Sequence, residues 1–419
     1  MLSKILKNTL VKNTITLVSG GVIAQIVALF CTPILSRYFT PEEFGVLGGV
    51  LTVSSILTVV ICMKYEMAIV LSSDSIERNQ IVTICMAILI SFSCIVFPVF
   101  YLYPETLVWL GLTQTNNTLI SLLCLLVLGT GIQKTFYQLH VKLGNYKLLS
   151  INRVVQKLAI VLVQLIFALF FMDELGLIWG YVLGFGFSLP FLIYSIRNEL
   201  KFNFFNSKLL EPFKRYYRFP LFNAPQSMLN SVSQGLPVLM LGKFFNLEQV
   251  GLYFFTVRIL QLPSSIIGGS IRQVFYKRAS EIKSDSVQIK KEFFKTTKGL
   301  FTIILGPMII IFSYGSEIFS FVFGEEWRVA GEYSRWMVLW IGAGFINPPA
   351  MSLYLIYNKQ GHLFVMETIL FVSRFAVLYL FAQKGNMLHT IQMYSLVGLV
   401  YNLFIVIYGF TFVKKRSLL

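Results

Sequence analysis

Seven basic side chains fall inside long apolar stretches of the sequence, where an unpaired charge is costly. They are Lys64, Lys134, Arg153, Lys157, Arg258, Arg272 and Arg374. Only Glu66 and Glu367 are acidic residues at a comparable depth in such stretches. Ionisable groups within hydrocarbon normally face the interior of a helix bundle or a water-filled cavity. A cavity lined by these residues would be net positive and would suit an anionic solute.

Polar residues in these stretches are spaced as on one face of a helix. All steps are of three, four or seven residues, which keep side chains on the same helical face. The sets are Asn223, Gln226, Asn230 and Gln234; Arg258, Gln261, Ser265, Gly269 and Arg272; Arg153, Lys157 and Gln164; and Glu367 with Arg374.

We therefore predict a substrate cavity and a group of candidates for coupling to a proton or ion gradient. The predicted cavity residues are Lys134, Arg153, Lys157, Gln164, Asn223, Gln226, Asn230, Gln234, Arg258, Gln261, Arg272 and Arg374. The coupling candidates are Lys64, Glu66 and Glu367.

Two alternatives stay open for these residues. Lys64, Glu66, Arg153 and Arg272 lie near predicted helix ends, where long side chains extend to lipid head groups. The Asn and Gln residues between 223 and 234 are equally suited to hydrogen bonds between neighbouring helices.

The composition is that of a membrane protein. Of the 419 residues 56% are hydrophobic and only 13% are charged, and the mean hydropathy is +0.72. A soluble chain of this length would have about a quarter of its residues charged.

A hydrocarbon core needs about 20 apolar residues per helix. Spans are predicted at 13–36, 44–71, 80–103, 118–139, 150–172, 177–197, 217–243, 251–275, 299–323, 334–357, 363–383 and 390–413.

The net charge of +16 reflects orientation in the membrane and gives no reason to expect a nucleic-acid partner. Most Lys and Arg residues outside the spans fall in alternate connections, on one side of the membrane. Because basic loops stay in the cytoplasm, both termini are expected to be cytoplasmic.

An internal repeat divides the chain near its middle. Segment 35–45 (LSRYFTPEEFG) aligns without gaps with segment 241–251 (LGKFFNLEQVG). The identical pairs are Leu35/Leu241, Phe39/Phe245, Glu42/Glu248 and Gly45/Gly251. Thr40 and Asn246 are also ordinary helix N-cap residues, so a generic turn signal is the alternative. As a repeat, the match predicts that the about 12 transmembrane helices of an all-α fold form two parallel six-helix halves. The bundles would be 1–200 and 217–419, joined by a cytoplasmic linker at 201–216.

Catalytic chemistry has no sequence signal. There is no GxxxxGK[ST] phosphate-binding loop. The three histidines, His140, His362 and His389, lie at predicted loop edges and form no metal-ligand pattern. We expect no catalytic residue, no metal and no cofactor, and therefore a function other than catalysis.

Three segments resemble a known family. They are PILSRYFTPEEFGVL at the first hairpin, MKYEMAIVLSSD (63–74), and IIGGSIRQVFYKRASE (266–281). Together they resemble the polysaccharide-biosynthesis flippases, the Wzx-like branch of the superfamily that also holds multidrug-and-toxin exporters and the lipid II flippase. Tyr65 and Glu66 match the family's second-span motif, and Arg272 lies in its eighth-span exit motif. The first span lacks an acidic residue, unlike that of many drug-exporting relatives.

The resemblance implies two six-helix bundles around a central cavity. It also implies alternating access around this cavity, which is cationic in the family, in the bacterial plasma (inner) membrane. The implied substrate is an undecaprenyl-diphosphate-linked oligosaccharide, such as an O-antigen or capsule repeat unit, moved from the cytoplasmic to the outer leaflet. Membrane lipids, a polysaccharide polymerase and glycosyltransferases are the expected partners. The alternatives are a cation-coupled multidrug-type exporter and a non-transporting scaffold for glycan assembly.

Overall fold

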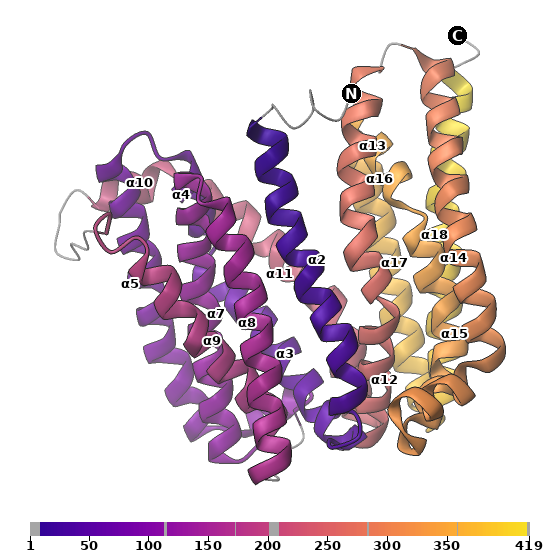
Figure 1. Ribbon diagram of the computed structural model, residues 1–419, viewed down its shortest axis with the longest axis horizontal. Helices are drawn as coiled ribbons and strands as arrows, with labels where there is room; N and C mark the ends of the chain where they lie inside the picture. Colours follow the sequence, from indigo (N-terminus) through magenta and orange to yellow (C-terminus); the bar gives the residue numbers. More distant parts are fainter. Residues whose placement is uncertain are drawn as a thin grey trace. The chain divides into compact units, whose positions relative to one another are not determined.

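The computed structural model in Figure 1 describes residues 9–112, 115–171, 173–200, 209–282, 285–357 and 359–416. These residues form helices joined by short turns, with no β-strand among them. Nine of the described helices are long and apolar enough to cross a membrane. Ser19–Leu35, which is part of the first described helix, is a shorter apolar helix. Each predicted span overlaps one helix or a run of consecutive helices. The predicted all-α membrane fold is confirmed.

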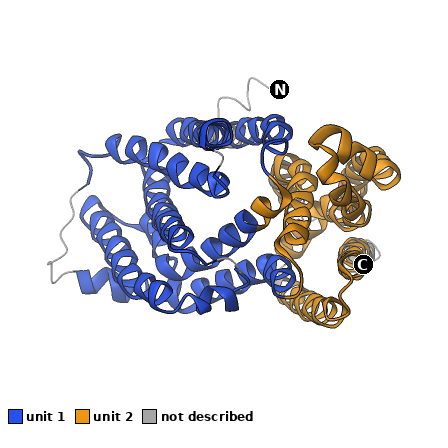
Figure 2. Cartoon of the chain, turned by 90° about the horizontal axis from the view of Figure 1, so that it is seen from below, with its two compact units in different colours: residues 1–39, 46–243 blue, residues 40–45, 244–419 orange. Residues whose placement is uncertain are grey.

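The chain divides into two compact units, shown in Figure 2. Unit 1 comprises residues 1–39 and 46–243, and unit 2 comprises residues 40–45 and 244–419. The helix α3 (Pro41–Cys62) therefore begins in unit 2 and continues in unit 1. The predicted bundles 1–200 and 217–419 have other boundaries and stay a prediction. Residues 201–208 of the predicted linker lie outside the described residues.

Unit 1 contains the helices from the first to the seventh predicted span. Its elements besides α3 are α2 (Thr9–Leu35), η1 (Tyr65–Met67), α4 (Ala68–Leu71), α5 (Ser75–Leu102), α6 (Glu105–Trp109), α7 (Asn117–Leu143), α8 (Tyr146–Ile166), η2 (Phe167–Phe171), α9 (Gly176–Tyr194), α10 (Leu210–Arg215), η4 (Phe219–Asn223) and α11 (Ala224–Phe244).

Unit 2 contains the helices from the eighth to the twelfth predicted span. Its elements are α12 (Leu247–Leu260), η5 (Ser264–Gly268), α13 (Gly269–Glu281), α14 (Ser286–Phe323), η6 (Glu325–Trp327), α15 (Arg328–Phe345), α16 (Pro348–Ile356), α17 (Gln360–Ala382) and α18 (Met387–Arg416). The turns η4 and η5 are π-helical and lie beside Pro225 and Pro263. Because proline has no N–H to donate, it favours such irregular turns.

Small residues allow α8 to pack closely against two neighbours in unit 1. A Cβ on Gly20 of α2 would lie 2.2 Å from the Oγ of Ser150. A Cβ on Gly180 of α9 would lie 2.2 Å from the Cγ of Gln164, whose side chain donates to the Leu177 carbonyl at 2.9 Å. Gln164 therefore lies buried in the contact between α8 and α9.

The two segments of the sequence repeat pack against each other inside unit 2. A Cβ on Gly45 would lie 2.1 Å from the carbonyl oxygen of Leu247, and a Cβ on Gly251 would lie 1.6 Å from the carbonyl oxygen of Pro41. The first turns of α3 and α12 thus touch backbone to backbone, an approach that any side chain at either position would prevent. This contact explains why both segments of the repeat have a glycine at the same position, Gly45 in one and Gly251 in the other.

The same segments also hold the helix caps that the alternative explanation required. Thr40 and Glu43 form a capping box, with the Thr40 backbone N–H donating to the Glu43 carboxylate at 2.6 Å. The Asn246 side chain accepts from the Gln249 N–H at 2.9 Å. The repeat therefore marks two capped helix starts and the contact between them.

The short helix α10 is fastened to unit 1 by polar and aromatic contacts. Tyr65 is buried, stacks on Phe213 with ring centroids 5.3 Å apart, and donates from its hydroxyl to the Phe213 carbonyl at 3.0 Å. Arg215 pairs with Glu77 at 3.0 Å, and the Tyr216 hydroxyl donates to the same carboxylate at 3.3 Å. Tyr65 of the second-span motif therefore positions the segment that precedes α11.

Substitution of Gly251 by Ala should destabilise the protein by about 1–3 kcal/mol, because the added methyl group meets a backbone carbonyl that cannot move alone. The measurement is thermal unfolding of the purified protein in detergent. Gly306→Ala is the matched control, since nothing lies within 4 Å of a Cβ there and Ala favours a helix over Gly. Equal thermal midpoints for Gly251→Ala and Gly306→Ala would contradict the proposed contact.

Substitution of Glu77 by Gln should loosen α10, because the pair with Arg215 is lost. A loss of about 1 kcal/mol would raise the opened population roughly fivefold. Trypsin should then cleave after Lys214 and Arg215 faster than in the unchanged protein, as followed by mass spectrometry. Glu105→Gln, at an exposed carboxylate without a hydrogen-bond or ion-pair partner among the described residues, should leave the rate unaltered. An unchanged rate in Glu77→Gln would show that the contact does not hold α10.

Candidate functional site

A polar cavity of about 400 Å³ lies in unit 1, between the segment after α3 and the helices α7 and α8. We call it the unit 1 pocket. Its lining residues are Lys64, Glu66, Met67, Gln133, Lys134, Tyr137, Gln138, Leu149, Asn152, Arg153 and Gln156.

An unusual backbone turn brings Lys64 and Glu66 to the unit 1 pocket. Met63 and Lys64 have φ angles of 45° and 61° and are the only residues other than glycine with positive φ in the part of the chain that the structure describes. Non-glycine residues rarely adopt this left-handed conformation. The turn ends α3 and starts η1, where Glu66 is buried. One oxygen of Glu66 lies 3.9 Å from the Lys64 ammonium nitrogen, and the other has no hydrogen-bond partner among the described residues.

The facing surfaces of α7 and α8 complete the unit 1 pocket. Arg153 donates from Nη2 to the Tyr137 hydroxyl at 2.6 Å, and Gln133 donates to Gln156 at 2.8 Å. Lys134 makes no ion pair with any residue described in the structure. With Lys64, Lys134 and Arg153 facing one acid, Glu66, the lining is net positive. Fixed positive groups with little solvent around them attract anions strongly.

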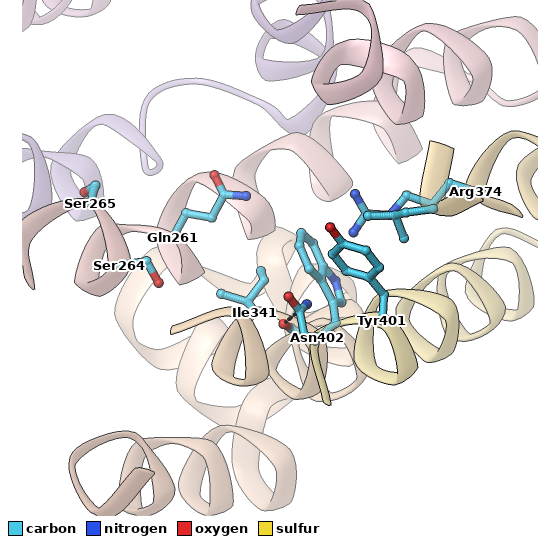
Figure 3. A pocket seen from close by; sticks show the side chains of 10 residues that line it. Gln261, Ser264, Ser265, Ile341, Arg374, Tyr401 and Asn402 are labelled. Carbon is cyan, nitrogen blue, oxygen red and sulfur yellow. Dashed lines mark hydrogen bonds between the residues drawn. The ribbon is translucent and has the colours of Figure 1, made fainter. Parts of the chain in front are cut away.

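A second cavity, of about 450 Å³, lies in unit 2 and is drawn in Figure 3. We call it the unit 2 pocket. Its lining residues are Gln261, Ser264, Ser265, Trp340, Ile341, Gly344, Leu370, Arg374, Tyr401 and Asn402. Figure 3 shows the Gln261 amide and the Arg374 guanidinium directed toward each other across the cavity.

Aromatic rings hold Arg374 in the unit 2 pocket. The guanidinium carbon lies 5.0 Å from the Trp340 ring centroid and 4.7 Å from that of Tyr394, distances typical of cation–π contacts. Among the described residues Arg374 makes no ion pair and no hydrogen bond, and its buried Nε lacks an acceptor, as does the Nε1 of Trp340. Asn402 fixes the backbone nearby by donating to the carbonyls of Trp340 and Gly398 at 3.1 and 2.8 Å.

The structure brings some of the predicted residues together and leaves others apart. Lys134 and Arg153, with the coupling candidates Lys64 and Glu66, line the unit 1 pocket. Gln261 and Arg374 line the unit 2 pocket. The role of each as a substrate contact stays a prediction.

The remaining predicted residues lie outside the two pockets. Lys157 lies with its ammonium 5.9 Å from the Tyr181 ring centroid. Asn223 and Arg258 are partly buried, while Gln226, Asn230, Gln234, Arg272 and Glu367 are exposed in the isolated chain. Gln234 donates to Asn230 at 3.2 Å, as expected for one helical face.

Several pocket residues were missed in the sequence. Gln133, Tyr137 and Gln156 lie within a turn of predicted basic residues, and that spacing could have indicated them. Trp340 and Tyr401 lie in apolar spans, where an aromatic residue gives no separate signal.

Comparison with solved structures identifies the fold. The chain is similar to the lipid II flippase MurJ in an inward closed conformation, with 13% identity, a TM-score of 0.69, and coverage of 96% of this chain and 91% of that chain. It is also similar to an inward-facing multidrug resistance MATE family transporter of the MOP superfamily, with 12% identity, a TM-score of 0.64, and coverage of 96% and 94%. The chain therefore has a MurJ/MATE-like fold of two helical bundles.

A sequence relative agrees with the resemblance seen in the three segments. The chain is 21% identical over 191 residues to the teichuronic acid biosynthesis protein TuaB of Bacillus subtilis (strain 168). The match covers 46% of this chain and 40% of that protein, so the chain aligns with less than half of its relative.

A family model gives the assignment. The model described as "Polysaccharide biosynthesis protein" matches residues 34–332, well over half of the chain. The match includes the repeat, the second-span motif and the eighth-span exit motif. The resemblance expected from those motifs is thereby confirmed, and the chain belongs to the polysaccharide biosynthesis protein family.

Proposed function

We propose that this multi-pass membrane protein is a flippase for undecaprenyl-diphosphate-linked oligosaccharides. The movement would run from the cytoplasmic to the outer leaflet of the bacterial inner membrane, with both termini cytoplasmic. The observation on which the proposal depends is the charge of the unit 1 pocket, where Lys64, Lys134 and Arg153 face a single carboxylate. Family and fold support transport of a glycan intermediate, and the pocket supports an anionic one.

The unit 1 pocket suits a diphosphate. A diphosphate diester presents two negative charges and several acceptor oxygens to a small volume. Lysine ammonium groups and an arginine fork bind such oxygens by charge-assisted hydrogen bonds. Glu66 lowers the net positive charge of the lining, which keeps the site from binding the anion so tightly that release fails. The amide of Asn152, and the amide atoms of Gln133 and Gln156 that lie outside their mutual hydrogen bond, would bind sugar hydroxyl groups, while the prenyl chain stays in lipid.

Translocation of this cargo breaks no covalent bond, so the proposal needs no catalytic residue and no cofactor. Alternating exposure of the binding site to the two sides requires only a shift between conformations that differ in affinity for the cargo. Glu66, beside Lys64 at the left-handed turn, is our first candidate for coupling to a proton or ion gradient, and Glu367 is the second. A polysaccharide polymerase and glycosyltransferases are the proposed functional neighbours.

A bacterial cell-surface glycan is the proposed cargo, of the kind found in O-antigen, capsule or related polymers. The relative named for teichuronic acid biosynthesis supports a surface polysaccharide. The similarity to a multidrug exporter supports a second candidate, a cation-coupled exporter of small amphipathic solutes. Overexpression distinguishes the two, because only an exporter should lower drug susceptibility.

Reversal of the charge at Lys134 should abolish flipping. In a strain that lacks the gene, Lys134→Glu should fail to restore surface glycan, and the lipid-linked oligosaccharide should accumulate on the cytoplasmic side. The reason is that the new carboxylate repels the diphosphate and leaves the lining without a positive excess. Surface glycan and lipid-linked intermediates are measured together, with the abundance of the protein in the membrane.

Lys298→Glu is the matched control, because Lys298 is exposed on α14 and lines neither pocket. It should restore the glycan fully. Full restoration by Lys134→Glu at normal abundance would contradict the proposal. Failure of both variants in proportion to their abundance would favour a scaffold for glycan assembly instead.

A further inference from the structure

We propose that the unit 2 pocket binds a carboxylate group on the glycan through Arg374 and so selects cargo that contains an acidic sugar. This inference rests on the proposed function, since it assigns a second part of the same substrate. It goes beyond that function in two ways. The unit 2 pocket binds a separate group, a monoanionic sugar, and it selects which glycan is carried.

The charge of the unit 2 pocket suits a monoanionic ligand. Its lining contains one cation, Arg374, and no acid, whereas the unit 1 pocket has three cations. A single guanidinium matches a single carboxylate in charge. Its planar fork also matches the two oxygens of a carboxylate, which it can bind through two parallel hydrogen bonds.

Arg374 has unused hydrogen-bonding capacity. The rings of Trp340 and Tyr394 fix the guanidinium in place without occupying its N–H groups. Among the described residues none accepts a hydrogen bond from it, although its Nε is buried. A guanidinium that served only to join α17 to α15 and α18 would be expected to find carbonyl or carboxylate acceptors there. Arg374 is therefore held in position while its N–H groups can donate hydrogen bonds to a ligand.

The rest of the lining of the unit 2 pocket suits a sugar ring. Trp340 and Tyr401 offer ring surfaces against which the apolar face of a sugar ring packs. Gln261 and Ser264 offer neutral donors and acceptors suited to sugar hydroxyl groups. The Ser265 hydroxyl donates to the Leu262 carbonyl at 2.8 Å, so it offers an acceptor oxygen. The two serines belong to the π-helical turn η5, and π-helical turns are frequent at functional sites. Figure 3 shows Gln261 opposite Arg374, so a ligand between them would contact both.

The test uses the purified full-length protein and three small probes. D-glucuronate carries the ring and the carboxylate, D-glucose carries the ring alone, and inorganic pyrophosphate represents the diphosphate. Each probe is titrated while the thermal unfolding midpoint is followed, since a ligand of the folded state raises that midpoint. D-glucuronate should raise it in a saturable manner, and D-glucose at equal concentration should not.

Four variants locate the binding. Arg374→Gln should weaken D-glucuronate binding about tenfold or more, and Arg374→Lys should weaken it less, because the charge remains while the fork is lost. Gln261→Glu, at an exposed position, should weaken it by charge repulsion with Arg374 still present, so the test does not depend on the stability of Arg374 variants. Lys134→Gln should weaken pyrophosphate binding and leave D-glucuronate binding unchanged.

Three results would overturn the assignment. One is equal stabilisation by D-glucuronate and D-glucose. Another is D-glucuronate binding that survives both Arg374→Gln and Gln261→Glu. If Arg374→Gln weakened pyrophosphate binding and left D-glucuronate binding intact, the pocket would be a diphosphate site and the inference would also fail. The proposed function fails separately, when Lys134→Gln leaves pyrophosphate binding intact.

Discussion

The cost of placing a charge in hydrocarbon is the constraint on which this structure depends. A membrane-spanning chain must satisfy its backbone internally, which it does by being helical, and must turn its charges inward or give them water. Arg374 illustrates the result, because two aromatic rings stabilise its charge while its N–H groups stay available. The unit 1 pocket illustrates it differently, with Glu66 partly offsetting its three cations. In both cases the charge is tolerated without being fully neutralised, which is the condition for binding an anion reversibly.

Irregular backbone occurs where the pockets are. The left-handed turn at Met63 and Lys64 gives the unit 1 pocket two of its charged residues, and the π-helical turn η5 gives the unit 2 pocket two of its hydroxyl groups. Non-helical backbone is tolerated at membrane depth where it is buried in protein or lines a cavity. The same left-handed turn precedes Tyr65, whose contact with Phe213 positions α10. One local distortion thus connects the charged pocket with the segment leading to α11.

The sequence predicts the helices well because a span is a local property of composition. The repeat was informative beyond its length, since Gly45 and Gly251 prove to be the point where α3 and α12 touch. Pocket residues were harder to predict. Lys134, Arg153 and Arg374 were indicated by the cost of their charge, but Gln164, which shares a helical face with Arg153, packs between α8 and α9. Trp340 and Tyr394 gave no signal, because an aromatic residue in a span is ordinary until the fold places an arginine beside it.

Transbilayer movement of the lipid-linked glycan can be measured directly with the purified protein. The purified chain is reconstituted into vesicles containing a fluorescently labelled undecaprenyl-diphosphate oligosaccharide, and a membrane-impermeant reductant is added outside. The reductant should reach label from both leaflets, because the protein exchanges the lipid-linked glycan between them. Label that stays protected in the inner leaflet, as in protein-free vesicles, would show that the protein is not a flippase for this lipid.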